Sequence, residues 1–269
     1  MPNEIVEMIA DKVVLKENPG VYISGGLDST IVLYHLSKLT SNIKTYTAKF
    51  DLVGDECDKA RKVADYYNTD HVEVKVENFI ERLQEILDIF EKPRYNVWPY
   101  FLAEKAKEDG IENVYIGEGS DEHFGGYQNK GYLDAWVDHQ VYVMPTYEVI
   151  HKTFGINLEV PFHQLNWEET KKWHSSPNKK LLVEAYRGLI PDNFLDTKKT
   201  PPAFSHYMQL WKSNISKFFP NIHPKCDADV RDILDYIATW NWSLNRYFII
   251  KEKMNKSEEK VNGRRYKNI

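Results

Sequence analysis

The segment 21–30, which reads V-Y-I-S-G-G-L-D-S-T, constrains the fold of this chain more than any other part of its sequence. Its first three residues are an apolar run that is typical of a buried parallel strand. Two glycines follow, and from Leu27 onwards the apolar spacing through Ile31, Tyr34 and Leu39 predicts a helix. A strand, a glycine turn and a helix N-terminus together predict a phosphate site, because the first N–H groups of a helix have no partner within it.

Polar side chains surround the two glycines of this loop. The hydroxyl donors are Ser24, Ser29 and Thr30, and the glycines that let the backbone approach a phosphate are Gly25 and Gly26. The carboxylate of Asp28 would repel a phosphate unless a divalent cation lay between them. The segment lacks the lysine of the common G-x-x-x-x-G-K-S/T loop. The alternative is a glycine-rich turn whose Ser or Asp side chain only caps the helix.

A second glycine-rich motif, G-E-G-S-D-E-H-F-G-G-Y, spans residues 117–127 and also follows a predicted strand. It gathers three carboxylates, Glu118, Asp121 and Glu122, where they could face the first loop. Together with Asp28 they could hold magnesium, which typically uses one or two carboxylates plus substrate phosphates. Taken alone, the motif fits equally well an acidic helix start that is exposed to solvent.

The first half of the chain alternates strand and helix patterns. The predicted strands are 21–23, 44–50, 71–76 and 113–116, and the predicted helices are 3–14, 27–39, 55–67, 78–90 and 99–107, with Asn78 as a helix cap. This alternation predicts an α/β fold, a parallel sheet with flanking helices, in which ligands bind at the carboxyl ends of the strands. Both glycine motifs fall at that edge.

The second half is predominantly helical. Helical patterns occur near 179–188, 205–218 and 227–254, and a short strand pattern occurs at 156–160. We find no low-complexity linker, so we expect a single domain over 1–269. It would comprise an α/β core at 19–127, a mainly helical part at 128–255 and a basic tail at 256–269.

Composition excludes several classes of protein. The formal net charge of −5 argues against a nucleic-acid groove. The two cysteines, Cys57 and Cys226, form no Cys-x-x-Cys pair, so neither a zinc site nor a disulfide framework is indicated. No apolar run is long enough to span a bilayer, and the first residues are not those of a signal peptide. We therefore expect a cytoplasmic protein that binds neither nucleic acid nor membrane.

The two motifs together resemble the synthetase domain of glutamine-dependent asparagine synthetases, in the ATP pyrophosphatase (PP-loop) superfamily. That superfamily also includes β-lactam synthetases and lasso-peptide cyclases, and the resemblance covers most of residues 20–205. It implies an ATP-dependent carbon–nitrogen ligase of asparagine biosynthesis. Such an enzyme activates a carboxylate, here the aspartate side chain, as an acyl-adenylate with release of pyrophosphate, and ammonia then attacks to give asparagine.

The resemblance also assigns residues. It implies that the ATP phosphates contact Ser24, Gly25, Gly26, Asp28 and Ser29, that Thr47 and Ala48 meet the adenine, and that Gly117 lies against the nucleotide. Asp28 and Asp121 would hold Mg²⁺, and Glu118 would assist attack on the adenylate. The family's charge-stabilising lysine corresponds to Lys199, with Lys198 in reserve. The alternative for both lysines is an ordinary solvated loop.

The chain also departs from the family pattern. Asn157, Glu159 and Gln164 stand where the family has Glu, Arg and Asp, and Thr197 replaces the arginine before the lysine pair. The replaced cation leaves two alternatives open. One is a related amide-forming or cyclising ligase, similar to β-lactam synthetases, that acts on another acid. The other is an inactive nucleotide-binding subunit.

The start of the chain bears on the nitrogen source. The family's glutaminase domain begins with a catalytic cysteine, whereas this chain begins Met1-Pro2. Cys57 lies beside Asp55, Glu56 and Asp58, which oppose formation of a thiolate. We therefore expect the chain to use free ammonia, which a separate glutaminase subunit could supply.

Overall fold

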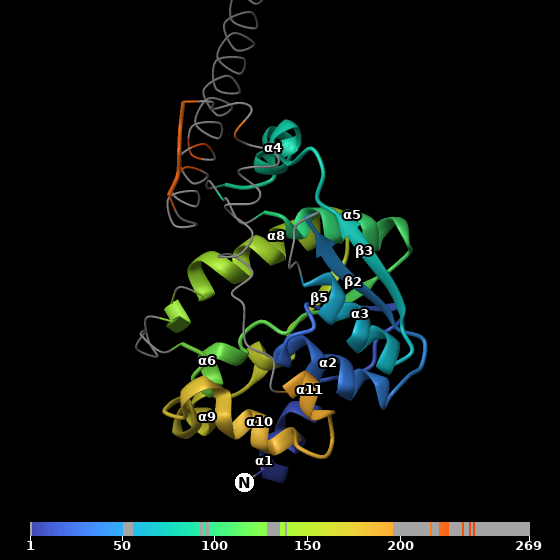
Figure 1. The fold of residues 1–269 in the computed structure, drawn as a ribbon, viewed down its shortest axis with the longest axis vertical. Coiled ribbons are helices and arrows are strands. Elements are labelled where there is room, and N and C mark those ends of the chain that lie inside the picture. Colours follow the sequence, from blue (N-terminus) through green and yellow to red (C-terminus); the bar gives the residue numbers. More distant parts are fainter. Residues whose placement is uncertain are drawn as a thin grey trace, which may run out of the picture.

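A five-stranded parallel sheet forms the centre of the molecule (Figure 1). The computed structural model describes residues 2–50, 56–91, 94, 97–127, 135–137, 139–195, 216, 221–225, 233, 237 and 239. The strands are β1 (Pro19–Tyr22), β2 (Lys44–Lys49), β3 (Asp70–Lys75), β4 (Asn113–Tyr115) and β5 (Asn157–Glu159), in the order β3-β2-β1-β4-β5. The predicted fold class is confirmed, and the strand pattern at 156–160 supplies the edge strand β5.

The burial of each strand follows its place in the sheet. β1 and β4 lie inside the sheet and every one of their residues is buried, as their apolar sequences predict for strands covered on both faces. The edge strands β3 and β5 are more exposed and more polar. Val21 of β1 lies beside Thr45 on one side and Tyr115 on the other, which fixes the register of the three central strands.

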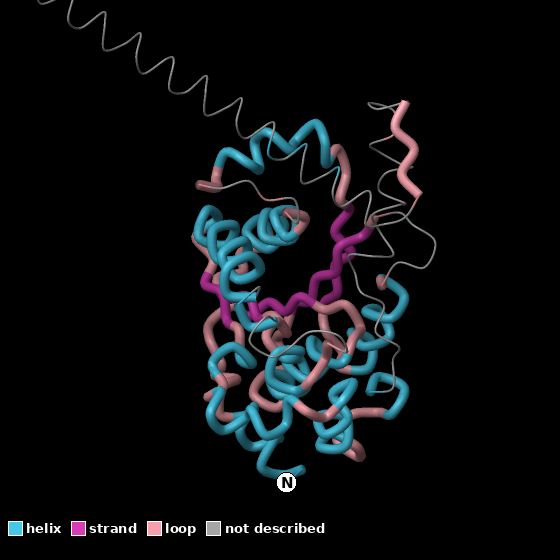
Figure 2. Tube along the Cα trace, turned by 90° about the vertical axis from the view of Figure 1, so that its left-hand side faces the viewer, coloured by secondary structure: helices cyan, strands magenta, loops and turns pink. Residues whose placement is uncertain are grey.

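Helices cover both faces of the sheet, as Figures 1 and 2 show. The first core contains side chains from α4 (Phe79–Asp88), α5 (Pro99–Glu108) and α8 (Met144–Phe154). The second contains side chains from α1 (Pro2–Ala10), α2 (Leu27–Ser37), α3 (Cys57–Tyr66), α6 (Ser120–Phe124), α9 (Trp167–His174), α10 (Lys180–Tyr186) and α11 (Asp192–Leu195). The short turns are η1 (His139–Val143, π-type), η2 (Pro161–Gln164) and η3 (Pro177–Lys179).

The first two predicted helices extend beyond the C-terminal ends of the observed ones. The helix predicted over 3–14 ends at Ala10, and the one predicted over 27–39 ends at Ser37. After Ala10 the N–H groups of Lys12 and Val13 bond three residues back, and after Ser37 those of Lys38 and Leu39 do the same. Each helix therefore closes in a tighter turn while the apolar spacing continues. Asn78 precedes α4, but its side chain makes no capping hydrogen bond.

Some predictions fall on residues that the structure does not describe. They are the helices at 205–218 and 227–254, apart from residues 216, 233, 237 and 239, and the basic tail at 256–269.

Candidate functional site

The first glycine loop joins β1 to α2 and is stabilised by its own hydrogen bonds and by close packing against α3. Gly25 has φ 70°, and a Cβ there would lie 2.5 Å from the backbone carbonyl carbon of Lys59 in α3, so only glycine fits. The hydroxyls of Ser29 and Thr30 donate to the carbonyl oxygen of Gly26 at 3.4 Å and 2.7 Å. The loop therefore presents the N-terminus of α2, the positive end of the helix dipole, at the carboxyl edge of the sheet.

The second glycine loop packs directly on the first. A Cβ on Gly117 would lie 2.7 Å from the backbone nitrogen of Ser29 and 2.8 Å from the backbone carbonyl carbon of Asp28. The hydroxyl of Ser120, the first residue of α6, donates to Oδ1 of Asp28 at 2.8 Å. This close approach accounts for the glycine at 117, whose contact with a nucleotide stays a prediction.

A buried lysine links the two loops. Nζ of Lys179 lies 2.7 Å and 2.6 Å from the two carboxylate oxygens of Asp28, and 2.8 Å from Oδ1 of Asp121. The lysine side chain is 6% exposed. Burial alone would lower the pKa of Lys179, but the two carboxylates outweigh it and hold that pKa above its usual value. The two aspartates predicted as metal ligands thus converge on a single positive charge.

The backbone at Lys179 is itself unusual. Asn178 and Lys179 have φ values of 56° and 57°, in the left-handed region that residues other than glycine adopt at a cost. This places the lysine immediately before α10, with its side chain directed back toward α2 and α6. Gly126 contributes space, because a Cβ there would overlap Oδ1 of Asp121 and lie 2.7 Å from Cε of Lys179. Sequence reasoning missed this lysine.

The other two carboxylates of the second motif lie elsewhere. Glu122 is 2% exposed and accepts a hydrogen bond from the hydroxyl of Tyr127 at 3.0 Å. Burial raises the pKa of Glu122, and the charges of Asp121 and Glu118 add to the effect. Glu118 is directed toward Tyr147, whose hydroxyl lies 3.4 Å from Oε1. Of the three carboxylates in this motif, Asp121 is joined to the first loop through the buried lysine, whereas Glu122 and Glu118 are each approached by a tyrosine hydroxyl.

The end of β2 lies beside the first loop. The hydroxyl of Thr47 donates to the carbonyl oxygen of Ile23, and the thiol of Cys57 donates to the carbonyl oxygen of Ala48 at 3.7 Å. Thr47 and Ala48 are therefore placed near the loop, although their predicted contact with adenine is not tested. The predicted lysine, Lys199, and its reserve, Lys198, lie outside the described residues.

The donor set at this edge suits magnesium that shares its coordination with phosphates. Within the described ranges no three His, Cys, Asp or Glu side chains form a metal-binding group. Asp28 and Asp121 nevertheless already gather around one cation, the ammonium of Lys179. Magnesium typically takes one or two carboxylates from a protein when substrate phosphates complete its shell, and these two aspartates match that number.

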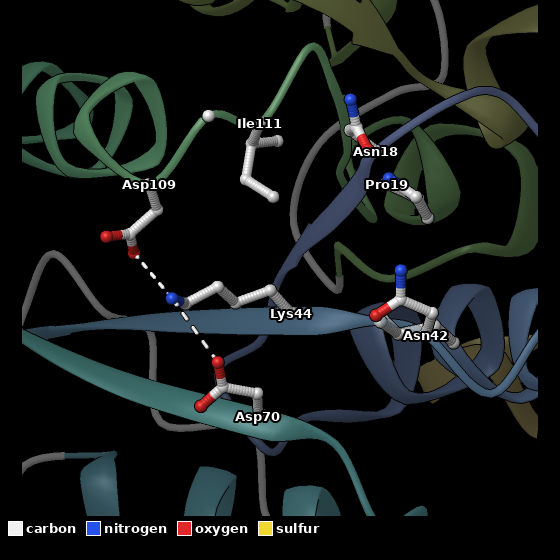
Figure 3. A pocket seen from close by; sticks show the side chains of 9 residues that line it. Asn18, Pro19, Asn42, Lys44, Asp70, Asp109 and Ile111 are labelled. Carbon is white, nitrogen blue, oxygen red and sulfur yellow. Dashed lines mark ion pairs between the residues drawn. The ribbon is translucent and has the colours of Figure 1, made fainter.

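A polar hollow lies at the opposite edge of the sheet (Figure 3). It has a volume of about 190 Å³ and is lined by the amino ends of β1, β2 and β3 and by the turn after α5. Lys44 lies between Asp70 and Asp109 there, at 3.3 Å and 3.0 Å. Because ligands of parallel α/β sheets bind at the carboxyl ends of the strands, we place the functional site at the two glycine loops and not at this hollow.

Comparison with known proteins identifies the family of this chain. The family model described as asparagine synthase matches residues 4–150, which is more than half of the chain and includes both glycine loops. The chain belongs to the asparagine synthase family. Lys179 lies beyond the matched segment.

Several curated relatives of this chain are asparagine synthetases. The glutamine-hydrolyzing asparagine synthetase 3 of Arabidopsis thaliana is 33% identical over 172 residues, covering 53% of this chain and 29% of its own. The enzyme of Zea mays is 36% identical over 143 residues, covering 46% of this chain and 24% of its own. "Amidase chry2" of Gibberella zeae is 38% identical over 128 residues, covering 40% of this chain and 19% of its own. The chain thus matches less than a third of the length of each.

Among solved structures, the NMN synthetase of Francisella tularensis aligns with 90% of this chain and 96% of its own length, at 14% identity and a TM-score of 0.44. None of the helices in the described ranges is both long and apolar enough to cross a membrane.

Proposed function

We propose that the chain is an ATP-dependent amide-forming ligase. It activates a carboxylate, with the aspartate side chain as the favoured substrate, and passes the acyl group to ammonia to give asparagine. The observation that carries this proposal is the convergence of Asp28 and Asp121, one from each glycine loop, on one cation at the N-terminus of α2. Membership of the asparagine synthase family and the relatives named asparagine synthetase support it.

The first step is adenylation. The substrate carboxylate attacks the α-phosphorus of ATP, the bond between the α- and β-phosphates breaks, and pyrophosphate leaves. The N-terminus of α2 and the Lys179 ammonium stabilise the charge that develops on the leaving group. Asp28 and Asp121 would hold magnesium, which supplies further charge neutralisation when it is bound with the phosphates. Ser24 and Ser29 would contribute hydroxyl contacts in the same loop, and Lys199 a further positive charge.

The second step is attack by the amine. The amine nitrogen bonds to the carbonyl carbon of the adenylate, the carbon–oxygen bond to AMP breaks, and a proton leaves the nitrogen. Glu118 accepts that proton in this proposal, because it is a carboxylate on the second loop and 36% of its side chain is exposed.

The test is pyrophosphate release with ATP, magnesium and aspartate. Asp28→Asn and Asp121→Asn should abolish it, and they should retain the folded spectrum of the wild-type chain. Asp70→Asn is the matched control, because Asp70 pairs with a lysine at the opposite edge of the sheet. Near-normal release in either site variant would overturn the assignment of both aspartates.

A second candidate function is the same chemistry on a different acid. Glu159 of β5 stands at the position where the family has an arginine, so a cation that could recognise aspartate is replaced by a carboxylate. The relative named "Amidase chry2" keeps this candidate open. A panel of acids, scored by pyrophosphate release, separates the two. Tight ATP binding with no release on any acid would instead favour a nucleotide-binding subunit without catalysis.

A further inference from the structure

The carboxylate of Glu118 is approached on both of its oxygens. The hydroxyl of Tyr147, in α8, lies 3.4 Å from Oε1, and Nε2 of His139, in the π-type turn η1, lies 3.7 Å from Oε2. Glu118 stands between two glycines, Gly117 and Gly119, which offer no side chains to support it. The direction in which this carboxylate points is therefore set by residues from α8 and η1.

The environment of His139 directs it toward Glu118. The imidazole is 2% exposed, and neither ring nitrogen has a hydrogen-bond partner in the part of the chain that the structure describes. A buried polar group without a hydrogen bond is costly, so such a group in a native protein indicates a function or a partner that completes it. The closest ion-pair contact of His139 is Glu118. π-Type turns such as η1 frequently occur at functional sites.

Aromatic rings hold the imidazole in place. Trp136 is stacked on His139 with ring centres 6.3 Å apart, and it is also stacked on His163 at 5.6 Å. His139 and His163 are 5.8 Å apart. Because the imidazole packs in one cluster with these two rings, its freedom to rotate is restricted and it can support the carboxylate.

The charges around His139 favour its protonated form. The groups that act on it are Glu118 from the second loop, Asp121, Glu122 and His123 from α6, and His163 from η2. Burial alone would lower the pKa of His139, but the adjacent Glu118 carboxylate and the charges of Glu122 and Asp121 raise it overall.

We propose that His139 is a positioning residue for the amine-transfer step, holding the Glu118 carboxylate toward the attacking nitrogen. This inference rests on the proposed function. When the amine bonds to the acyl carbon and the bond to AMP breaks, the proton from nitrogen goes to Glu118, and His139 keeps its own protons. His139 acts after adenylation, so its loss leaves activation of the acid intact.

The experiment compares two substitutions that differ in reach. The amide nitrogen of His139→Gln can occupy the place of Nε2, which faces Glu118, whereas the shorter side chain of His139→Asn cannot. Both variants should catalyse ATP–pyrophosphate exchange at the wild-type rate. His139→Asn should lower kcat for amide formation by roughly 10–100-fold at saturating amine, as expected for a displaced catalytic group. His139→Gln should recover most of that loss.

A readout that does not depend on turnover completes the test. The imidazole of His139, followed by NMR, should titrate at lower pH in Glu118→Gln than in the wild-type chain. Glu148→Gln is the control, since Glu148 acts on His163 instead, and it should leave His139 unchanged.

The outcomes are distinguishable. If the wild-type chain exchanges no pyrophosphate with any acid, the proposed function is wrong and this inference falls with it. If exchange is normal but His139→Asn forms amide at the wild-type rate, the inference alone is wrong. Equal losses in the Gln and Asn variants, or an unchanged His139 titration in Glu118→Gln, would also overturn it.

Discussion

The two edges of the sheet carry the same chemical group in different settings. At the carboxyl edge Lys179 lies between Asp28 and Asp121, and at the amino edge Lys44 lies between Asp70 and Asp109. The Lys179 side chain is 6% exposed, and the Lys44 side chain is 25% exposed. Asp70 is largely in solvent.

The difference shows that a lysine between two aspartates does not by itself make a functional site. At the carboxyl edge two glycine loops exclude water from around the charges and bring a helix N-terminus to them, so each charge depends strongly on the others. At the amino edge water also solvates the charges of Lys44 and Asp70. Asp109 has a second cationic partner there, because Nζ of Lys105 lies 2.7 Å from its carboxylate. Four predictions test how far this contrast extends.

The largest expected effect comes from removing each lysine. Lys179→Met leaves two carboxylates facing each other in a buried site, and should lower the free energy of unfolding by about 3–5 kcal/mol. Lys44→Met should cost roughly 0–1 kcal/mol, because its partners are solvated or have another cation. Urea denaturation measures both. Magnesium should restore part of the lost stability in Lys179→Met and none in Lys44→Met. Equal losses of stability in the two variants would contradict the proposed difference between the two edges.

The glycines at the two edges offer a matched pair. Gly125 and Gly110 have φ values of 70° and 77°. A Cβ on Gly125 would overlap two carbonyl oxygens, those of His174 and Ser176, whereas a Cβ on Gly110 would meet no atom within 4 Å. Gly110→Ala should therefore cost only about 1–2 kcal/mol of backbone strain. Gly125→Ala should cost about 1–3 kcal/mol more, from overpacking. Thermal unfolding of the two variants would show the difference, and a smaller loss for Gly125→Ala would contradict it.

Mild acid should loosen the support of the carboxyl edge. His35, near the end of α2, forms a 2.6 Å hydrogen bond with the hydroxyl of Tyr186 in α10, and burial lowers its pKa to about 4. The folded state thus binds fewer protons than the unfolded state between pH 6.5 and 4. Stability falls as the pH falls through that window, by about 1.4 kcal/mol per pH unit.

Unfolding measured at pH 7, 6 and 5 should therefore show a shallower pH dependence in His35→Gln than in the wild-type chain. If stability depended on pH equally in His35→Gln and in the wild-type chain, the neutral imidazole of His35 would not contribute to the packing of α2 against α10.

Salt should give the smallest effect. At 1 M salt the screening length is about 3 Å, so the contribution of Lys44 at the open edge should approach zero. The contribution of Lys179 should change little, because solvent ions are excluded from its surroundings. The comparison requires the cost of each lysine substitution at low and high salt. A large salt effect on Lys179→Met would mean that water reaches the buried pair.

The fold and both loops could be predicted from the sequence because their signals are local. Alternating strands and helices indicate the parallel sheet, and glycines beside a strand end indicate the loops at 24–26 and 117–119. The structure brings these loops into contact as the topology requires, since parallel strands end at the same edge.

Lys179 and the contact of His139 with Glu118 could not be predicted in the same way. Lys179 is 151 residues from Asp28 in the sequence, and its role depends on a left-handed backbone that no property of lysine indicates. The one available signal was Asn178, a residue type that tolerates this conformation, just before an apolar helix. His139 reaches Glu118 only because η1 and the second loop meet in space.

The packing of α1 against α10 has a consequence for shortened forms of this protein. A chain trimmed to begin at Pro19 would keep every residue of the two glycine loops, and by motif it would look intact. It would nevertheless lose Ile5 and Ile9, which lie in the core that α10 shares. Because Lys179 directly precedes α10, such trimming would release the cation that holds Asp28 and Asp121 together. Whether a shortened form is intact therefore depends on the contacts of Lys179 with these two aspartates, and the presence of both glycine motifs does not establish it.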